Sequence, residues 1–300
     1  MVSDDLLNPV DVLSIVAVLL LAAVVGLFRR QLGDDAGWLL GILFSVLLFI
    51  GFVSLVASRR REWRVVHAFS PIVVIIVLFS ILGPIIRCVR PLLWDAFFAQ
   101  LDAQIFGTLA ERWRNVLGRP AWFTDLTYLA YLSYYLAPVV VVAALYRAGD
   151  EERFRSVVFR IAFTFYASYV GYFLFPTFGP RVPLGREAAV IGGGYLSQGV
   201  RLFLHYAERT LTDAFPSGHT AIALLCLYFA WQISGTLFVL LVPAVIGIIF
   251  STVYLHYHYV VDVVAGIVMA IGCGWLGPRI EPAFEPRGVR RWLALRFGMR

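Results

Sequence analysis

One stretch of the chain decides how it can fold: His256-Tyr257-His258-Tyr259-Val260-Val261-Asp262. Its two imidazoles and its carboxylate stand at the start of an apolar run that continues to Gly274. An ionised carboxylate inside a membrane-length segment costs about 2.5–3.5 kcal/mol on insertion scales, so Asp262 needs a partner or a function. If the run is helical, His258 and Asp262 are i and i+4 on one face. Asp262 could then orient one nitrogen of His258 and leave the other as nucleophile or base. Alternatively, the two residues could form an ion pair that only lowers the cost of placing Asp262 in the bilayer.

The composition is that of an integral membrane protein. The 300 residues are 60% hydrophobic and 15% charged, with a mean hydropathy of +0.81. Every basic residue is arginine. The net charge of +6 is spread over loops and a basic tail, a pattern that indicates membrane topology more than nucleic-acid binding. The three cysteines are widely spaced and suggest neither a disulfide framework nor a metal cluster. We therefore expect a membrane partner and no nucleic acid.

Several apolar runs reach the roughly 20 residues that a membrane span needs. We expect an all-α, polytopic transmembrane helix bundle with roughly eight spans. The expected spans are residues 10–28, 38–57, 69–86, 126–145, 157–175, 215–231, 237–250 and 259–276. Residues 90–124 mix aromatic and charged side chains, as expected of interfacial helices, a lid or a plain connecting loop. Residues 196–211 could form a second amphipathic helix.

The same pattern divides the chain into four regions. They are N-terminal transmembrane segments (1–90), interfacial helices or a lid (91–123), a catalytic six-helix-type core (124–277) and a basic cytoplasmic tail (278–300). The densest basic loop, with arginines at 59, 60, 61 and 64, indicates the cytoplasmic side. With eight spans, this loop, residues 147–155 and both termini share that side, and the motifs near residues 180, 215 and 258 face the other. A bacterial inner (plasma) membrane is the expected location.

A second motif, Phe215-Pro216-Ser217-Gly218-His219-Thr220, opens the sixth expected span. Proline suits the first turn of a helix, and the free N–H groups that follow are a ready site for a phosphate. Ser217 adds a hydroxyl, Gly218 lets an anion approach the backbone, and His219 can give a proton. As an isolated string, the motif could equally be a helix cap and nothing more.

The two motifs together resemble the type-2 phosphatidic acid phosphatase superfamily. Pro216-Ser217-Gly218-His219 is followed by Ser251-x6-His258-x3-Asp262, as in that family. Segments 102–107 and 128–135 look like the branch that includes the inositol phosphorylceramide synthases. Thr252 stands where the family usually has arginine, a departure that this branch shares. The first family motif, Lys-x6-Arg-Pro, is absent because the chain has no lysine, and Arg181 is the candidate substitute.

The resemblance implies a metal-independent lipid phosphatase or phosphotransferase, with no cofactor and a phosphohistidine intermediate. His258 would attack phosphorus, Asp262 would orient it, and His219 would protonate the leaving oxygen and later take a proton from the acceptor. The implied substrate is a phospholipid or lipid phosphate, and a transferase would also bind a lipid alcohol. The implied phosphate-binding residues are Arg181, Ser217, Gly218, Ser251 and Thr252.

Other functions remain open at this stage. Hydrolysis and lipid-to-lipid headgroup transfer share their first half-reaction, so the sequence leaves the acceptor undecided. A proton- or ion-coupled transporter could use His219, His258 and Asp262 as a relay, but it would need further ionisable residues deep in other spans, where only Arg160 comes near. A metal site at His256, His258 and Asp262 lacks a convincing further ligand. We expect His256 to be interfacial or a second contact, and His67 and His205 to be structural.

Overall fold

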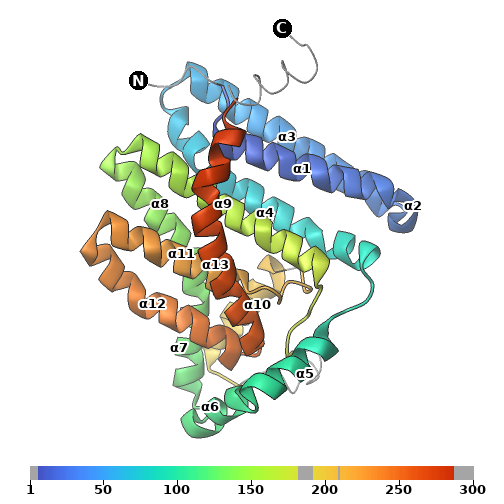
Figure 1. The fold of residues 1–300 in the computed structure, drawn as a ribbon, viewed down its shortest axis with the longest axis vertical. Helices are drawn as coiled ribbons and strands as arrows, with labels where there is room; N and C mark the ends of the chain where they lie inside the picture. The colour runs from blue at the N-terminus through green and yellow to red at the C-terminus, as the bar shows by residue number, and fades with distance from the viewer. Residues whose placement is uncertain (1–5, 182–191, 209, 287–300) are drawn as a thin grey trace.

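The computed structural model describes residues 6–181, 192–208 and 210–286, and this part of the chain is a bundle of helices with no strand longer than an isolated bridge (Figure 1). This confirms the all-α prediction. The elements are α1 (Pro9–Leu27), α2 (Arg29–Leu32), α3 (Asp35–Arg59), α4 (Trp63–Val89), α5 (Asp95–Phe106), α6 (Leu109–Leu117), α7 (Ala121–Leu132), η1 (Ser133–Tyr135), α8 (Ala137–Ala148), α9 (Glu151–Leu174), α10 (Tyr195–Ala207), α11 (Gly218–Ile233), α12 (Gly235–Tyr254), α13 (Val260–Ile280) and η2 (Glu281–Phe284).

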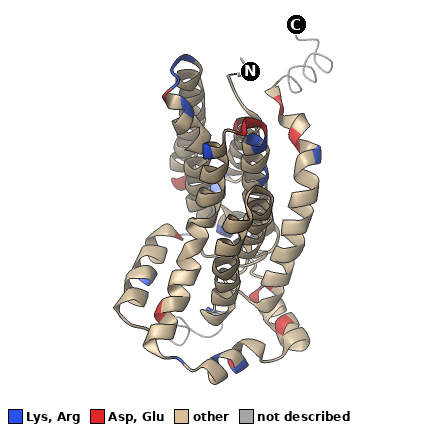
Figure 2. Cartoon of the chain, turned by 90° about the vertical axis from the view of Figure 1, so that its left-hand side faces the viewer, with Lys and Arg blue, Asp and Glu red and all other residues tan. Residues whose placement is uncertain are grey.

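The number of membrane spans is six or seven in the described residues, against the eight expected. Six helices are long and apolar enough to cross a membrane: α1, α3, α4, α9, α12, and α13 with its η2 extension. The seventh is the bent pair of α7–η1 and α8, if it counts as one span. The expected span at 215–231 corresponds to α11, which is apolar but only 16 residues long. Charged residues gather towards the ends of the long helices (Figure 2).

The fourth expected span, residues 126–145, is broken. The helix axis bends by 44° between Ala121–Tyr135 and Ala137–Ala148. Pro138 has no N–H to donate to the carbonyl of Tyr134, so the α-helical ladder cannot run through this point. The break leaves Tyr134 and Tyr135 in a short 3-10 turn at the level of the catalytic motifs.

The N-terminal helices pack directly on the rest of the bundle. Asn8 caps α1 by accepting a hydrogen bond from the Asp11 amide at 3.0 Å, and the Asp11 carboxylate accepts one from the Asn8 amide at 2.9 Å. Both α1 and α4 pack against α9, so α9 joins the first 90 residues to the rest of the bundle. Leu78, Ile81 and Leu82 of α4 are fully enclosed there.

The segment at 90–124 is helical, as one of the three expectations for it required. Its helices α5 and α6 lie at one end of the bundle, and α5 packs against α13 (Figure 1). Helix α10 covers most of the expected amphipathic helix at 196–211 and packs on α7. Residues 182–191 of the long loop, and residues 287–300 of the expected basic tail, lie outside the described residues.

The basic loops lie together at the opposite end of the bundle. A polar cavity of about 630 Å³ is lined by Arg61 and Arg64 from one loop and by Asp150 and Arg155 from another. His67 pairs with Asp11 at 2.8 Å beside it, which suits the structural role expected for this histidine. The short helix η2 packs on α1, so the described carboxyl end lies near the amino end.

Candidate active site

The two histidines that the sequence predicts to be catalytic lie next to each other, with ring centroids 5.4 Å apart. His219 lies in the first turn of α11, and His258 lies in the turn between α12 and α13. His219 Nδ1 and His258 Nε2 are 3.3 Å apart, and both side chains are buried. Helices α11 and α13 are joined at this point because the Ser217 amide donates to the Asp262 carbonyl at 3.0 Å. Two motifs 39 residues apart therefore form one site.

His258 is held by its Nδ1 atom. This nitrogen lies 2.7 Å from the Ala214 carbonyl oxygen and 3.5 Å from Asp262 Oδ2, so it carries the proton and Nε2 keeps its lone pair. The expected i, i+4 pairing on one helix is wrong in detail, because α13 begins only at Val260 and His258 precedes it. Asp262 instead caps that helix by accepting from the Tyr259 amide at 2.8 Å. Burial lowers the pKa of His258 to about 4, so the ring is neutral at physiological pH.

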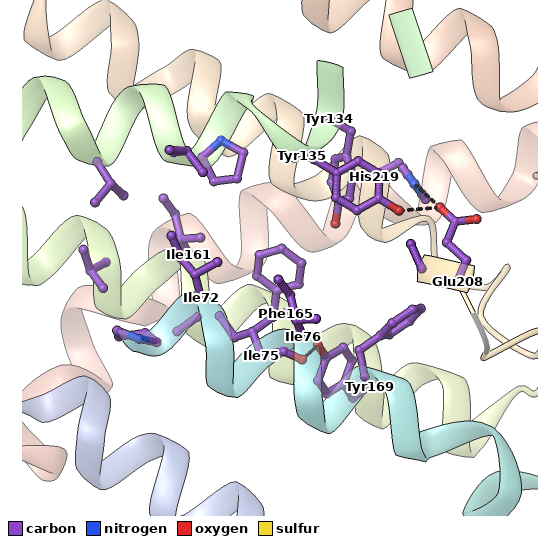
Figure 3. Close-up of a pocket in the computed structure, with 18 of the residues that line it drawn as sticks. Ile72, Ile75, Ile76, Tyr134, Tyr135, Ile161, Phe165, Tyr169, Glu208 and His219 are labelled. Atoms are coloured by element: carbon purple, nitrogen blue, oxygen red, sulfur yellow. Dashed lines mark hydrogen bonds and ion pairs between the residues drawn. The ribbon is translucent and has the colours of Figure 1, made fainter. Parts of the chain in front are cut away.

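His219 has a partner that sequence reasoning missed. Its Nε2 atom lies 3.7 Å from Glu208 Oε1, the oxygen that also accepts hydrogen bonds from the hydroxyls of Tyr131 at 2.8 Å and Tyr135 at 2.9 Å. Figure 3 shows Glu208 and the two tyrosine rings of residues 134 and 135 grouped around His219. The Tyr134 ring centroid is 4.2 Å from that of His219. Glu208 thus lies on the Nε2 side of the ring, where its negative charge favours the protonated imidazole, and Nδ1 faces His258.

The buried carboxyl group of Glu208 and the half-buried one of Asp213 set the charge of the site. Burial alone would raise the pKa of Glu208, but His219 and Arg181 beside it hold that pKa below its ordinary value, so Glu208 is ionised. Burial raises the pKa of Asp213 to about 7, with the Glu208 charge adding to the rise and Arg181 opposing it. A second negative charge is therefore costly here at neutral pH. Nothing in the spacing of Glu208 or Asp213 along the chain pointed to this role.

Arg181, the predicted substitute for the missing lysine motif, does reach the site. Its guanidinium carbon lies 4.2 Å above the ring centroid of Tyr257, next to the catalytic turn. Burial would lower its pKa, but Tyr257 and the carboxyl groups of Asp213 and Glu208 raise it above the ordinary value. The guanidinium is thus a fixed positive charge on a wall of the site, and it is suited to a phosphoryl oxygen.

The loop that carries Arg181 is anchored by Asp95 of α5. The carboxylate accepts hydrogen bonds from the amides of Phe178 and Gly179, each at 3.0 Å. Gly179 has φ +81°, and a Cβ there would clash with the Tyr257 carbonyl, so only glycine fits. A second carboxylate of α5, Asp102, accepts from the Val261 amide at 2.9 Å at the start of α13. Helix α5 therefore supports both sides of the site.

We expect Asp95→Ala to lower kcat/KM by about tenfold or more, mainly through KM, because two charge-assisted hydrogen bonds of about 1.5–3 kcal/mol each hold the Arg181 loop. Steady-state kinetics with a lipid phosphate, together with inhibition by inorganic phosphate, measures the effect. Gln104→Ala, an exposed position on the same helix, is the matched control. Unchanged phosphate affinity in Asp95→Ala would show that the loop holds Arg181 without Asp95.

The other predicted phosphate ligands are occupied within the protein. The Ser217 hydroxyl caps α11 by accepting from the Thr220 amide at 3.3 Å. A Cβ at Gly218 would lie 2.6 Å from the Tyr172 hydroxyl, so a tyrosine side chain already packs against this glycine. Ser251 and Thr252 donate to carbonyls of their own helix at 2.7 Å and 2.8 Å.

Thr252 acts on the site through its backbone instead. Its carbonyl accepts from the amides of Tyr257 at 2.9 Å and His258 at 3.0 Å, which closes the catalytic turn. His256 lies in the same turn with φ +63°, and it is buried. Among the described residues, no group of three His, Cys, Asp or Glu side chains is arranged to hold a metal ion. Metal independence stays a prediction.

Comparison with known proteins supports the family predicted from the motifs. A family profile described as the PAP2 superfamily matches residues 96–276, a region that runs from α5 to α13 and contains Arg181, Glu208, His219, His258 and Asp262. Comparisons with curated proteins and with solved structures gave no match. The branch with the inositol phosphorylceramide synthases is finer than this match resolves. Because the profile covers more than half of the chain, the protein belongs to the PAP2 superfamily.

Proposed function

We propose that this protein is a metal-independent lipid phosphate phosphatase or phosphotransferase that works through a phosphohistidine on His258. The superfamily's chemistry is of the phosphatase type and acts on lipid phosphates. The observation that carries the proposal is the pair of ring nitrogens, 3.3 Å apart, each left reactive because the other nitrogen of its ring is hydrogen-bonded or ion-paired elsewhere. One nitrogen is a nucleophile and the other a proton carrier, which is the minimum that transfer through an enzyme intermediate needs.

In the first half-reaction, His258 Nε2 attacks phosphorus as the bond from phosphorus to the leaving oxygen breaks. His219 begins this step as an imidazolium that Glu208 stabilises. Its Nδ1 proton goes to the leaving oxygen. Arg181 faces the charge on the transferring oxygens, which fixed donors stabilise best in a dry site. A 3.3 Å gap has no room for a phosphoryl group between the two nitrogens, so the rings must part when substrate binds.

In the second half-reaction, an acceptor hydroxyl attacks the phosphohistidine and gives its proton to His219 Nδ1. The nitrogen–phosphorus bond breaks, and His258 returns to its neutral form. With water the product is phosphate, and with a lipid alcohol it is a new lipid headgroup, as in enzymes of the inositol phosphorylceramide synthase type. The same residues serve both outcomes, so the acceptor decides between hydrolysis and transfer.

We infer that the site faces the extracytoplasmic side. The loops at 59–64 and 147–155 share one end of the bundle with the described termini, whereas α5, α6 and the catalytic turns are at the other end (Figure 1). Dense arginine in short loops favours the cytoplasm. This topology would put His258 near the outer leaflet and both termini inside.

Purified protein in detergent, given a panel of lipid phosphates with and without a lipid alcohol, tests the proposal. We expect release or transfer of phosphate that persists in a chelator. Acid-labile, base-stable labelling from a radioactive phospholipid would mark the covalent histidine. Activity that disappears with chelator and returns with a divalent cation would overturn the metal-free mechanism.

The pH profile should expose the neutral nucleophile. Burial lowers the pKa of His258 to about 4, and only the unprotonated ring attacks, so we expect the acid limb of kcat/KM to lie near pH 4 instead of near 6.5. The profile is measured with a correction for the second ionisation of the substrate phosphate, about 6.

Asp213, with a pKa of about 7, is the other group expected to titrate near the site. Asp213→Asn removes its contribution and should leave the His258 limb in place. An acid limb at or above pH 6.5 that persists in Asp213→Asn would contradict a neutral buried nucleophile.

A further inference from the structure

An apolar cavity runs from the active site into the bundle. Its volume is about 390 Å³, and it is enclosed by α4, α8 and α9, with η1 and α10 beside the site. Glu208 and His219 line one end of it (Figure 3), and Asp213 is also among its lining residues. The remaining wall is almost wholly apolar, with Ile72 and Ile161 among its residues. A polar metabolite would lose its hydration along this wall without gaining partners, so the body of the cavity suits a hydrocarbon.

The cavity is open at its side. Helix α9 packs against both α4 and α8, whereas no comparable packing joins α4 to α8. Ile76 of α4 lines the cavity and still exposes 55% of its surface. At the end away from His219, the rings of Phe69 and Tyr146 approach to 5.8 Å between α4 and α8. The cavity is therefore a groove that opens between α4 and α8 towards the surroundings of the bundle, which in a membrane are lipid chains.

The length of the groove matches one leaflet. Its α4 wall runs from Ala68 to Phe79, a rise of about 16 Å at 1.5 Å per residue. Half of a hydrocarbon core about 30 Å thick is about 15 Å, the depth that one chain of a membrane lipid fills. The Tyr169 hydroxyl, part-way along this wall, donates to the Ile75 carbonyl at 2.9 Å and so needs no partner from a ligand.

We propose that this groove binds one alkyl chain of the lipid that reacts at His219, and that α4 selects the chain. The proposal rests on the proposed function, because the reacting headgroup determines which lipid enters. Helix α4 lies outside residues 96–276, so this wall is an addition to the family region. The N-terminal helices are then part of substrate recognition as well as membrane anchoring. The lipid in the groove is the phosphate donor, the alcohol acceptor, or each in turn. Donor and acceptor both carry an alkyl chain.

The test uses two tryptophan substitutions next to each other on α4. Ile72→Trp fills the groove, whereas Val73→Trp adds the same bulk at a residue that is 48% exposed and does not line it. Each is combined with His258→Ala, so that no turnover occurs. The proteins are placed in lipid nanodiscs and irradiated with a long-chain lipid phosphate that carries a diazirine at the chain end. A second arm uses a lipid alcohol with the same chain.

We expect the label on groove residues of α4, α8 and α9, reduced by about tenfold in Ile72→Trp and unchanged in Val73→Trp. Labelling in the phosphate arm identifies the donor chain, and labelling in the alcohol arm identifies the acceptor chain. If Ile72→Trp does not fold, Ile76→Trp at the exposed side opening replaces it, with the same expectation. Label spread evenly over outward-facing residues, or insensitive to both tryptophans, overturns the proposal.

This readout is independent of catalysis. Groove labelling in a protein whose wild type acts on no lipid phosphate would leave the chain site standing and remove the proposed chemistry. Turnover of lipid phosphates with no labelling of the groove would support the proposed chemistry and overturn the proposed chain site. In an active enzyme, kcat/KM for long chains relative to short ones should fall about tenfold in Ile72→Trp with His258 restored, and stay constant in Val73→Trp.

Discussion

Replacing His258 with alanine is expected to reduce phosphate release from a lipid phosphate by about 10³-fold or more, because the proposed nucleophile, His258 Nε2, is lost. The covalent label from a radioactive substrate should disappear with it. Initial rates and acid-labile labelling, measured on the same preparation, check both parts.

His205→Ala is the matched control for this experiment. His205 is exposed on α10, and its ring contacts Tyr206 and not the catalytic residues. The control should keep its activity within a factor of about two, as exposed substitutions usually do. If His258→Ala still forms a base-stable phosphoenzyme, the nucleophile is a different residue.

The second large effect is expected at the proton-carrying pair. His219→Ala should lower the rate on a lipid phosphate by about 10²–10⁴-fold, the usual contribution of a general acid. Glu208→Gln should lower it by about 10²-fold, because the amide still accepts from Tyr131 and Tyr135 but no longer stabilises the imidazolium. Tyr135→Phe, which removes one hydrogen bond and keeps the charge, should cost much less.

An aryl phosphate separates this role from a structural one. Its leaving oxygen needs no proton, so His219→Ala and Glu208→Gln should lose far less activity on it than on a lipid phosphate, while His258→Ala loses both. In His219→Ala the second half-reaction stays slow, so the phosphoenzyme should accumulate from the aryl substrate. Equal losses on the two substrates would assign Glu208 and His219 to holding the fold.

Several features of the fold were predictable because their causes are local. The apolar runs that became α1, α3, α4, α9, α12 and α13 are long enough to cross a bilayer, and this depends on composition alone. The start of α11 followed from the motif at 215–220, although Ser217 proved to be the cap, with Pro216 before it. The break before α8 was missed, although Pro138 in the middle of an expected span was a visible reason for it.

The proximity of the two histidines was also predictable, because the spacing of two motifs indicated it. His219, His258 and Asp262 come together as expected, and Arg181 lies close by. The predicted ligands Ser251 and Thr252 show the limit of this reasoning. A hydroxyl in a helix can bond to its own preceding turn, and only the folded helix shows that both do so.

The partners of the catalytic residues had to be read from the fold. Glu208 reaches His219 from just beyond the end of α10, the Ala214 carbonyl reaches His258 from a loop, and Asp95 holds the Arg181 loop from α5. Each contact joins residues 11 to 84 positions apart, and no periodicity along a chain encodes such a distance. Hydrophobicity is a local and additive property, so the sequence alone is enough to show it. Which buried carboxylate contacts which imidazole depends on how the helices pack, and only the tertiary structure shows that packing.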